Sequence, residues 1–583
     1  MTKIQSRIIG IGIICLAALI LWQAPSFAQN NAKPNDSQAQ AAPHDDKTPA
    51  NPPTAPPSKT DPSAKGTSNP ANAEILAELE RMRARIAELE AQLKAQSGDA
   101  PATVPVAPPI MANNAAPTSA SSEQPPSAAP TAPPGEPPVA PITLQTGDKK
   151  PEVSAPFAFA DFTWLNGNSR TTESPLATKY FTPEFRADTS YIEDFNHPSD
   201  HTLVGSSESG RTGEVQLQQL GIGGDFQVGN VRGRLMTQFG MYSTMTPRND
   251  GSPGVGQWNL ADAYRYISEA YGGYHFNVLH GVNVDAGIFM SYIGLFSYYN
   301  FDNWAYQPSY VSSNTPWFFE GVRIQIFPSD KLKIEPWFIN GWQSYGKFNH
   351  YPGAGGQIAY RPKGWLAFVF NNYGLGTDTL GNPGRSRIHA DYSVEVKYYD
   401  KKDNWLDKMA FSLTGDAGCE YGGGVSCMGT RSGGGCVPLV GYTNCPKQSF
   451  IGFMAYNRFW FRRDTLGLTI GGGEINNPGR YLVLVPPING ATAITGTPYF
   501  TGNPGDPFKA WDASATFDYM PVQFITFRWE YDYRHANVPY FAGPGGVTPA
   551  GGNTGNPSVL VPGFTPDLRK DESRINLALL VKF

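Results

Sequence analysis

The chain has few charged residues and, beyond its first 28 residues, no long apolar run. Asp, Glu, Lys and Arg make up 16% of its 583 residues, whereas soluble domains usually carry about 25%. The formal net charge is −5, so the basic surface that a nucleic-acid partner requires is not expected. No later stretch offers the roughly 20 consecutive apolar residues of a membrane-spanning helix. These shortages argue against a nucleic-acid-binding protein and against a helical membrane protein.

Motifs for catalysis and for cofactors are also missing. The sequence contains no Gly-x-Ser-x-Gly, no His-Glu-x-x-His and no phosphate-binding loop. His389, with Ser386 or Ser393 near it, is a weak Ser/His candidate, because 8 scattered histidines produce such neighbours by chance. We therefore expect no enzymatic activity, no cofactor and no metal site.

The N-terminal end has the three parts of a secretory signal peptide. Lys3 and Arg7 give it a positive start, residues 8–21 are apolar, and a small residue, Ala28, ends the cleavage site. The apolar part is shorter than a membrane-spanning helix requires, so a retained anchor is the less favoured alternative. Residues 1–28 are thus predicted to be removed, which places the mature chain outside the cytoplasm.

Two segments rich in Pro and Ala flank a short heptad pattern. Residues 29–72 and 97–154 contain almost nothing large and apolar, so they are predicted to be disordered linkers. In residues 73–96, apolar side chains recur at alternating spacings of four and three, as in a coiled coil. These side chains are Ile75, Leu79, Met82, Ile86, Leu89 and Leu93. A trimeric coiled coil is predicted, with a lone amphipathic helix as the alternative.

From residue 155 onward, apolar and polar residues alternate as they do in strands. Between residues 525 and 534 one series is Ile, Phe, Trp, Tyr and Tyr, and the other is Thr, Arg, Glu, Asp and Arg. Aromatic residues make up 13% of the chain, which also has 62 glycines. This composition suits a barrel whose strands face lipid on one side and a wet lumen on the other. The predicted fold class is an all-β transmembrane antiparallel β-barrel over residues 155–583.

Short turns and long loops give the strand count. Hairpins with short periplasmic turns are expected, because bacterial outer-membrane barrels keep their long loops outside. Their cores are 213–243, 266–294, 316–342, 354–373, 386–417, 449–475 and 509–533. A first strand near 157–165 and a last strand at 574–583 make about 16 strands, an even number as in other such barrels. Residues 185–195 are assigned to the first external loop, and counting them and a partner as spanning would give about 18 strands.

Two stretches resemble a known family of barrels. Residues 289–342 read FMSYIGLFSYYNFDNWAYQPSYVSSNTPWFFEGVRIQIFPSDKLKIEPWFINGW, an aromatic, Asn-rich crossing followed by a Ser-rich loop and a Pro-Trp-Phe-Phe-x-Gly strand. Residues 200–226 read DHTLVGSSESGRTGEVQLQQLGIGGDF. Both resemble the β-barrel porin-2, or OmpL-like, family of outer-membrane proteins. The resemblance covers residues 155–583 and implies a porin-like barrel. The order of signal peptide, coiled coil and barrel is also the layout of porins tethered to the cell wall, which suggests peptidoglycan as a partner of the N-terminal segment.

The third external loop, residues 295–315, is the expected pore constriction. By strand count it corresponds to the loop that folds into the lumen of general porins. Its aromatic residues lie among amides, with a single charge, and this combination suits sugar rings that stack and hydrogen-bond. The candidate residues are Tyr298, Tyr299, Asp302, Trp304 and Tyr306. The alternative is a loop packed on the inner wall whose tyrosines fill space.

Charged residues at lumen-facing positions are the other candidates for selectivity. They are Arg232, Arg234, Arg323, Arg528, Glu530, Asp532 and Arg534. Their mixed signs argue against strong ion selectivity. The alternative for each residue is a salt bridge within the wall, and this is the preferred interpretation of Arg528/Glu530 and Asp532/Arg534.

Four cysteines of the mature chain lie in a Gly-rich external loop. They are Cys419, Cys427, Cys436 and Cys445. An even number in an exported chain predicts two disulfides, with three pairings open. The wide spacings argue against a zinc site.

The sequence thus predicts a passive outer-membrane porin, a homotrimer that passes small hydrophilic solutes, with saccharides as one class. Its partners would be outer-membrane lipid and the solute, and its N-terminal segment would lie in the periplasm. The alternative function is a structural or adhesive barrel tethered to the cell wall by that segment.

Overall fold

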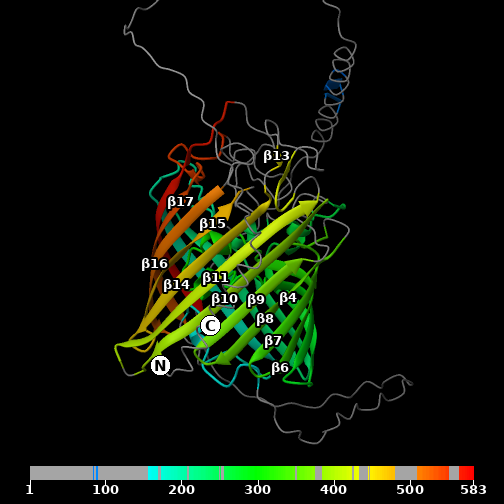
Figure 1. Cartoon of the computed structure of the whole chain (residues 1–583), viewed down its shortest axis with the longest axis vertical. Helices are drawn as coiled ribbons and strands as arrows, with labels where there is room; N and C mark the ends of the chain where they lie inside the picture. The colour runs from blue at the N-terminus through cyan, green and yellow to red at the C-terminus, as the bar shows by residue number, and fades with distance from the viewer. Residues whose placement is uncertain are drawn as a thin grey trace, which may run out of the picture. The chain divides into compact units, whose positions relative to one another are not determined.

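The protein is a closed antiparallel β-barrel in the computed structural model (Figure 1). The structure describes residues 80, 83–84, 87–88, 155–168, 173–206, 209–247, 250, 252, 255–347, 351–374, 384–402, 404–422, 426–431, 444–445, 447–478, 508–550 and 563–583. The strands of the barrel are β1 (Phe181–Asp194), β2 (Val215–Val228), β3 (Val231–Thr237), β4 (Ile267–Phe276), β5 (Val282–Met290), β6 (Phe318–Ser329), β7 (Leu332–Ile339), β8 (Gly353–Lys363), β9 (Leu366–Gly374), β10 (Arg385–Asp400), β11 (Leu406–Gly422), β14 (Ser449–Phe461), β15 (Leu466–Asn477), β16 (Phe508–Val522), β17 (Ile525–Ala536) and β20 (Asp571–Lys582). The predicted barrel of 16 strands is confirmed.

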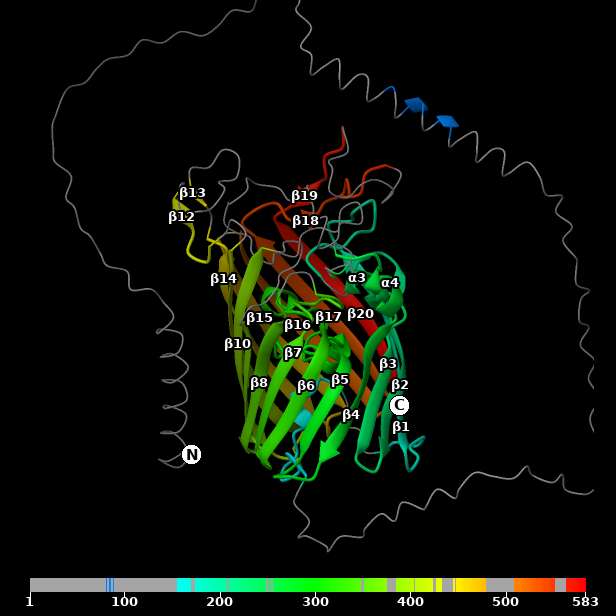
Figure 2. The ribbon, with the colours of Figure 1, turned by 90° about the vertical axis from the view of Figure 1, so that its right-hand side faces the viewer.

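Short turns and long loops alternate around the barrel. Every predicted hairpin is present, and together the hairpins contain β2–β11 and β14–β17. Apart from the loop between β5 and β6, the described long loops carry two short helices, α3 (Tyr242–Met245) and α4 (Leu260–Tyr264), and two small sheets. The sheets are β12 (Thr430–Arg431) with β13 (Asn444–Cys445), and β18 (Phe541–Ala542) with β19 (Leu568–Arg569). All four elements gather at one end of the barrel (Figure 2).

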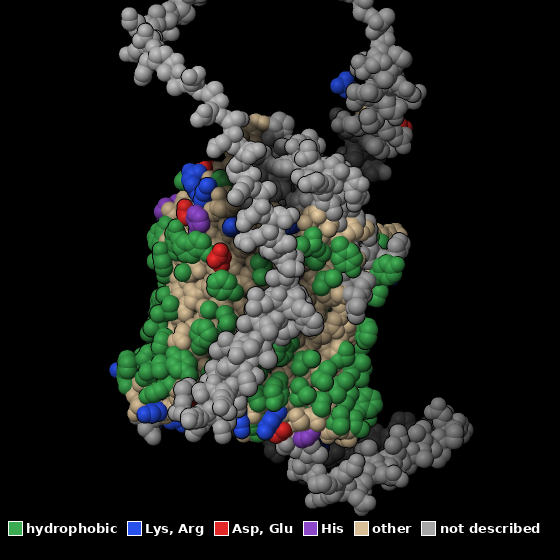
Figure 3. Space-filling view, in the orientation of Figure 1, with side chains coloured by type: hydrophobic (Ala, Val, Ile, Leu, Met, Phe, Trp, Pro, Cys, Tyr) green, Lys and Arg blue, Asp and Glu red, His purple; other side chains and the backbone are tan. Residues whose placement is uncertain are grey.

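Alternation along the strands determines which face meets lipid. In β17, Trp529 and Tyr531 are 43% and 46% exposed, whereas Arg528 and Glu530 beside them are buried. Lipid does not accept charge and a wet lumen does, so the aromatic series faces outward and the charged series inward. Apolar side chains gather over the outer surface, and charged side chains lie mainly toward its lower and upper ends (Figure 3).

The barrel closes between its first and last strands. β1 pairs with β20 in antiparallel register, and the backbone N–H of Phe583 donates to the carbonyl of Phe185 at 3.0 Å. Closure leaves no unpaired strand edge facing lipid, where unsatisfied backbone groups are costly. The predicted last strand is confirmed, and it begins a few residues earlier, at Asp571.

The first strand does not lie where the sequence pattern placed it. Residues 157–165 contain no strand and only a short 3-10 helix, η1 (Thr163–Leu165). Most of residues 185–195, assigned to an external loop, belong to β1. The alternation in β1 is faint because outward-facing positions such as Ala187 and Thr189 are not strongly apolar. Trp164, by contrast, is buried, so the apolar residues before β1 are not a lipid-facing series.

The N-terminal predictions lie almost entirely outside the described residues. This holds for the signal peptide, 1–28, and for both linkers, 29–72 and 97–154. Within 73–96 the described residues are Glu80, Arg83, Ala84, Ala87 and Glu88, all of them helical and exposed. None of these is an apolar heptad position, so the coiled coil stays a prediction. Across the described ranges, no helix combines the length and the apolar character needed to cross a membrane.

Candidate functional site

The loop between β5 and β6, residues 291–317, folds into the lumen. It contains a 3-10 helix, η4 (Asn300–Asp302), and a short helix, α5 (Tyr310–Ser313). Most of its residues are buried, and α5 contacts β14, β15 and β16. We call residues 291–317 the pore loop; it contains the stretch 295–315 expected from the sequence.

Carboxylates of the wall strands hold the middle of the pore loop. Glu530 on β17 accepts the backbone N–H groups of Tyr306 at 2.5 Å and Gln307 at 2.7 Å. Asp512 on β16 accepts the backbone N–H of Tyr310 at 3.0 Å. Hydrogen bonds to an ionised acceptor are roughly twice as strong as neutral ones. The loop is therefore fixed against the side of the barrel that β16 and β17 form.

Two arginines and an aspartate form a buried cluster beneath the pore loop. Asp518 on β16 lies 2.7 Å from Arg458 of β14 and 2.6 Å from Arg528 of β17. Arg528 also donates to the carbonyl oxygens of Asn300 at 3.2 Å and Asn303 at 3.0 Å. We call these three side chains the arginine cluster. Its excess positive charge points at backbone carbonyls of the pore loop, which partly compensates for burying it.

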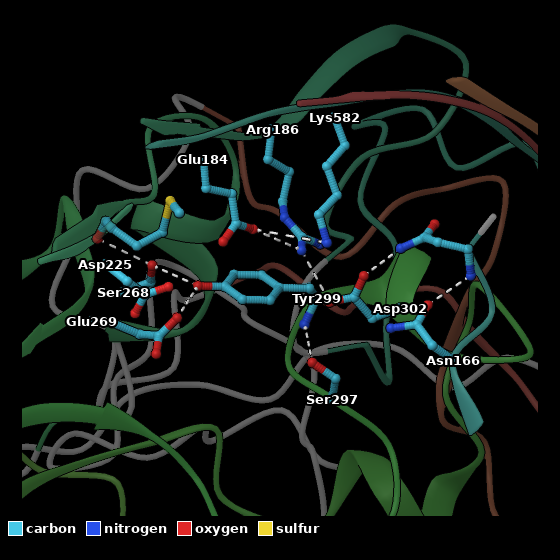
Figure 4. Close-up of polar contacts among 12 residues, drawn as sticks. Asn166, Glu184, Arg186, Asp225, Ser268, Glu269, Ser297, Tyr299, Asp302 and Lys582 are labelled. Atoms are coloured by element: carbon cyan, nitrogen blue, oxygen red, sulfur yellow. Dashed lines mark hydrogen bonds and ion pairs between the residues drawn. The ribbon is translucent and has the colours of Figure 1, made fainter. Parts of the chain in front are cut away.

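A second ionic network contacts η4 and the residue before it (Figure 4). Arg186 on β1 lies 3.0 Å from Asp302 and 4.3 Å above the ring of Tyr299. The Tyr299 hydroxyl donates to Glu269 of β4 at 3.0 Å, and Arg186 also lies 3.2 Å from Glu184. The tip of the pore loop is therefore tied to β1 and β4 as well as to β16 and β17.

The predicted constriction residues all belong to the pore loop, but most of their surface faces protein. Tyr298 donates to Gln238 at 2.9 Å. Trp304 is 2% exposed, its indole N–H donates to the carbonyl of Trp164 at 3.3 Å, and its ring meets Trp460 with centroids 5.7 Å apart. This packing leaves little of the Trp304 ring free for a solute.

The predicted lumen-facing arginines of β3 and β6 are engaged in ion pairs. Arg234 lies within 3.0 Å of three carboxylates, those of Glu184, Asp225 and Glu269. Arg232 and Arg323 share Asp285, at 3.4 Å and 3.1 Å. These charges neutralise one another along the wall.

Charges on β17 pair with neighbouring strands rather than with each other. Arg528 pairs with Asp518, as described above, Arg534 lies 3.8 Å from Glu572, and Asp532 lies 3.8 Å from Arg574. The pairs found are directly opposed across strands, where side chains approach more closely than along one strand. They take the place of the pairs Arg528/Glu530 and Asp532/Arg534 expected from the sequence.

Two cavities are bordered by residues of the wall, and one of them also by the pore loop. The loop-side cavity has a volume of about 290 Å³ and is bordered by Asp302 of the loop and by Arg361 and Glu395 of the wall. The rim-side cavity has a volume of about 480 Å³ and lies among Lys397, Asp400, Lys408 and Asp464. Both are lined by polar groups and by charges of both signs, so they can hold water and small polar molecules.

A family model for outer-membrane barrels matches this chain. The family is described as "Putative beta-barrel porin-2, OmpL-like", and its model matches residues 186–560, more than half of the sequence. The chain belongs to this family. The resemblance seen in the sequence is thereby confirmed, and this member of the porin-2 family is a porin-like barrel of the outer membrane.

Several solved outer-membrane barrels are similar to this porin-2 barrel at low sequence identity. OmpT of Vibrio cholerae is 9% identical with a TM-score of 0.38, covering 70% of this chain and 99% of its own. An anion-selective porin from Comamonas acidovorans is 10% identical with a TM-score of 0.38, covering 69% and 99%. The outer membrane channel DcaP of Acinetobacter baumannii is 13% identical with a TM-score of 0.37, covering 70% and 96%. No curated protein matches the chain.

The cysteine loop of the porin-2 barrel contains a disulfide. Cys419 in β11 is bonded to Cys427, with Cα atoms 5.1 Å apart. This selects one of the three pairings left open by the sequence. Cys436 and the side chain of Cys445 lie outside the described residues, so the second disulfide stays a prediction.

Two external loops of the porin-2 barrel are tied together by Asp200. This residue of the β1–β2 loop accepts the backbone N–H groups of Val547 at 2.9 Å and Thr548 at 2.7 Å, both in the β17–β20 loop. Burial would raise the pKa of Asp200, but these hydrogen bonds and one from Thr202 outweigh it and lower the pKa below its usual value.

The described residues around His389 do not assemble a Ser/His pair. Nε2 of His389 lies 2.7 Å from Asp416 on β11, and Ser393 is hydrogen-bonded to Thr414 at 2.9 Å. Within the described part of the chain, no group of three or more His, Cys, Asp or Glu residues could hold a metal ion.

The sequence interpretation missed several residues that hold the pore loop. Asp512 and Asp518 occupy inward positions of β16, and its alternating pattern could have revealed them. Asp188 accepts the hydroxyl of Tyr306 at 2.9 Å. No local signal marked Asp188, because its strand was assigned to a loop.

Proposed function

We propose that this porin-2 barrel is a passive channel for small hydrophilic solutes. The observation that supports the proposal is the polar lining of two cavities: the loop-side cavity, which borders the pore loop, and the rim-side cavity. A barrel of this size is too wide for its side chains alone to fill. Polar groups along the route replace part of a solute's hydration shell, which permits entry without tight binding.

Neutral solutes fit the arrangement of charge better than ions of either sign. Arg234 and Arg323 are each paired with carboxylates, Glu269 at 3.0 Å and Asp285 at 3.1 Å among them. Because these charges are paired locally on the wall, the net electric field along the pore is weak. The channel should therefore discriminate little between small cations and small anions.

Saccharides are the class of neutral solute that we propose. Phe162 and Phe296 border the loop-side cavity together with the amides of Asn166 and Asn303. Rings beside amides suit sugars, whose apolar faces stack while their hydroxyls hydrogen-bond. Phe162 is only partly buried, so it is better placed for this contact than the buried Trp304.

Planar bilayers test the channel. Purified protein should give stepwise conductance with weak ion selectivity, and bilayers that stay closed with well-folded protein would contradict the proposal. Maltose should block the current, and Phe162→Ala should weaken that block. If maltose blocks the current of Phe162→Ala as strongly as that of wild type, the proposed saccharide contact is wrong. The proposed channel function would not be affected.

A homotrimer is proposed from the heptad pattern of 73–96. Conductance steps should come in groups of three, and deletion of 73–96 should abolish the grouping. If the deletion leaves the grouping and instead abolishes co-sedimentation with peptidoglycan, the N-terminal segment is a periplasmic wall anchor. Closed bilayers together with that co-sedimentation would favour the alternative, a structural or adhesive barrel.

A further inference from the structure

The segment before the first strand, residues 155–168, lies at the turn end of the barrel (Figure 2). The backbone N–H of Phe157 donates to the carbonyl of Asp330 in the β6–β7 turn at 2.7 Å. The indole N–H of Trp164 donates to the carbonyl of Gly364 in the β8–β9 turn at 3.1 Å. We call residues 155–168 the inner segment. Hydrogen bonds to two separate turns fix its position.

The inner segment also contacts the pore loop. The backbone N–H of Gly167 donates to the carbonyl of Asp302 at 2.8 Å, and the carbonyl of Trp164 accepts the indole N–H of Trp304. Arg458 of the arginine cluster donates to the carbonyl of Gly167 at 3.0 Å. The inner segment and the pore loop therefore share one set of hydrogen bonds, with the arginine cluster behind both.

The fit at Gly167 leaves no room for a side chain. A Cβ atom there would lie 1.9 Å from the carbonyl oxygen of Asn303 and 3.0 Å from the guanidinium of Arg528. Trp164 is 1% exposed and belongs to an apolar cluster with Trp304 and other residues of the lumen. A segment lying loosely in the lumen would need neither a glycine at this point nor a buried tryptophan.

The inner segment lies between the two cavities. Phe162, Leu165 and Asn166 border the loop-side cavity, whereas Asp161 and Trp164 border the rim-side cavity. Neighbouring residues of one short stretch thus face both spaces. A route from one cavity to the other runs past this stretch.

We propose that the inner segment is a second constriction of the pore, in series with the pore loop, and that it sorts solutes by size. This proposal rests on the channel function proposed above. Phe162, Trp164 and Leu165 supply bulk on the sides that face the cavities, and Asp161 supplies one charge. The ionic network, by contrast, is built around the pore loop. Selection by size is thus assigned to the inner segment, whereas most of the paired charges lie around the pore loop.

Removal of the Trp164 side chain is the first test. Trp164→Ala deletes the indole between the cavities, so single-channel conductance in planar bilayers should rise roughly twofold, because conduction depends on pore width. The largest poly(ethylene glycol) that enters the pore should become larger as well. Trp405→Ala is the matched control: Trp405 is 64% exposed, so its loss should change neither quantity.

A second variant moves the inner segment without deleting an aromatic ring. Gly167→Val forces the segment away from Asn303, and we expect the same rise in conductance and in the size limit. Gly415→Ala is the matched control, because a Cβ at that position meets nothing within 4 Å. The heat-dependent shift in gel mobility checks that each variant is folded.

A chemical readout separates this proposal from the channel proposal. Ser412→Cys places a thiol at the loop-side cavity, and a bulky charged thiol reagent should label it severalfold faster when Trp164→Ala is also present. If Trp164→Ala speeds up the labelling but the protein does not conduct, the proposed channel function is wrong. The inner segment would then still restrict access to the loop-side cavity. Folded Trp164→Ala and Gly167→Val proteins with wild-type conductance, size limit and labelling rate would overturn the constriction.

Discussion

The carboxylate of Glu530 accepts the backbone N–H of Gln307 at 2.7 Å, and through this contact strand β17 holds the middle of the pore loop. The two residues are 223 positions apart in the chain. The loop's own helices are only a single turn long, and helices of that length are not stable alone. The position of the pore loop therefore depends on the wall behind it.

Replacement of Glu530 should loosen the pore loop without unfolding the barrel. Glu530→Leu leaves the N–H groups of Tyr306 and Gln307 without an acceptor, which costs about 3 kcal/mol locally. We expect added noise and brief closures in single-channel recordings, while the heat-dependent gel shift remains. Glu530→Gln, which keeps an acceptor oxygen, should lie between Glu530→Leu and wild type. Glu474→Gln is the control, because Glu474 is exposed. Quiet traces in Glu530→Leu would contradict the anchoring role.

The arginine cluster predicts the order in which its variants lose stability. Asp518→Leu leaves two buried arginines without their carboxylate, and an uncompensated buried charge costs about 3–5 kcal/mol. Arg528→Met leaves Asp518 paired with Arg458 and should cost less. The triple variant Arg458→Met/Asp518→Leu/Arg528→Met removes every charge of the cluster and should be more stable than Asp518→Leu alone. Urea unfolding followed by gel mobility measures the order, and a triple variant less stable than Asp518→Leu would refute it.

The Asp200 contact between external loops should be sensitive to acid. Because the pKa of Asp200 is lowered in the folded protein, its ionised form stabilises the contact above the usual carboxyl pKa, and this stabilisation is lost as the pH falls through the lowered value. Amide hydrogen exchange at Val547 and Thr548, corrected for the intrinsic pH effect, should accelerate over that range. In Asp200→Ala, which has no side-chain acceptor, the exchange should be fast throughout and independent of the titration. Equal protection in this variant and in wild type would contradict the prediction.

The disulfide between Cys419 and Cys427 should protect the external loop that contains it. The pair closes a ring 8 residues apart in sequence, and a crosslink of that length restricts the unfolded loop by about 2 kcal/mol. Cys419→Ser/Cys427→Ser should therefore be cut faster by protease between β11 and β14, with the barrel intact. Peptide mapping of the wild type should also find Cys436 joined to Cys445. Free thiols at Cys436 and Cys445 would refute the second disulfide.

The strands were predictable where alternation is strong on both faces. β17 and β20 place large apolar residues outward and polar residues inward, and both were recognised. β1 was missed because its inward charges, such as Arg186 and Asp188, have partners in the pore loop, which is far away in sequence. An isolated strand with those charges looks like an exposed loop.

Residues 295–315 lie in the third external loop, as the sequence predicted, whereas the anchoring of this loop was not foreseen. Its rank among the external loops follows from counting hairpins, which the sequence supports. Whether a ring such as that of Trp304 faces water or protein depends on Trp164 and Trp460, which are distant in sequence. The inner segment was mistaken for a strand because local patterning does not distinguish rings buried inside a barrel from rings facing lipid.

The contacts of the pore loop bear on the order in which the protein assembles. The loop lies near the middle of the chain, but its acceptors Asp512 and Glu530 lie near the C-terminal end and Asp188 lies in the first strand. None of these side chains is in place until the C-terminal strands have joined the sheet and met β1. Long-range contacts of this kind form late in folding, because the intervening chain must first be ordered. The pore should therefore take its final width only at closure, and a partly built barrel would have a wider opening than the finished one.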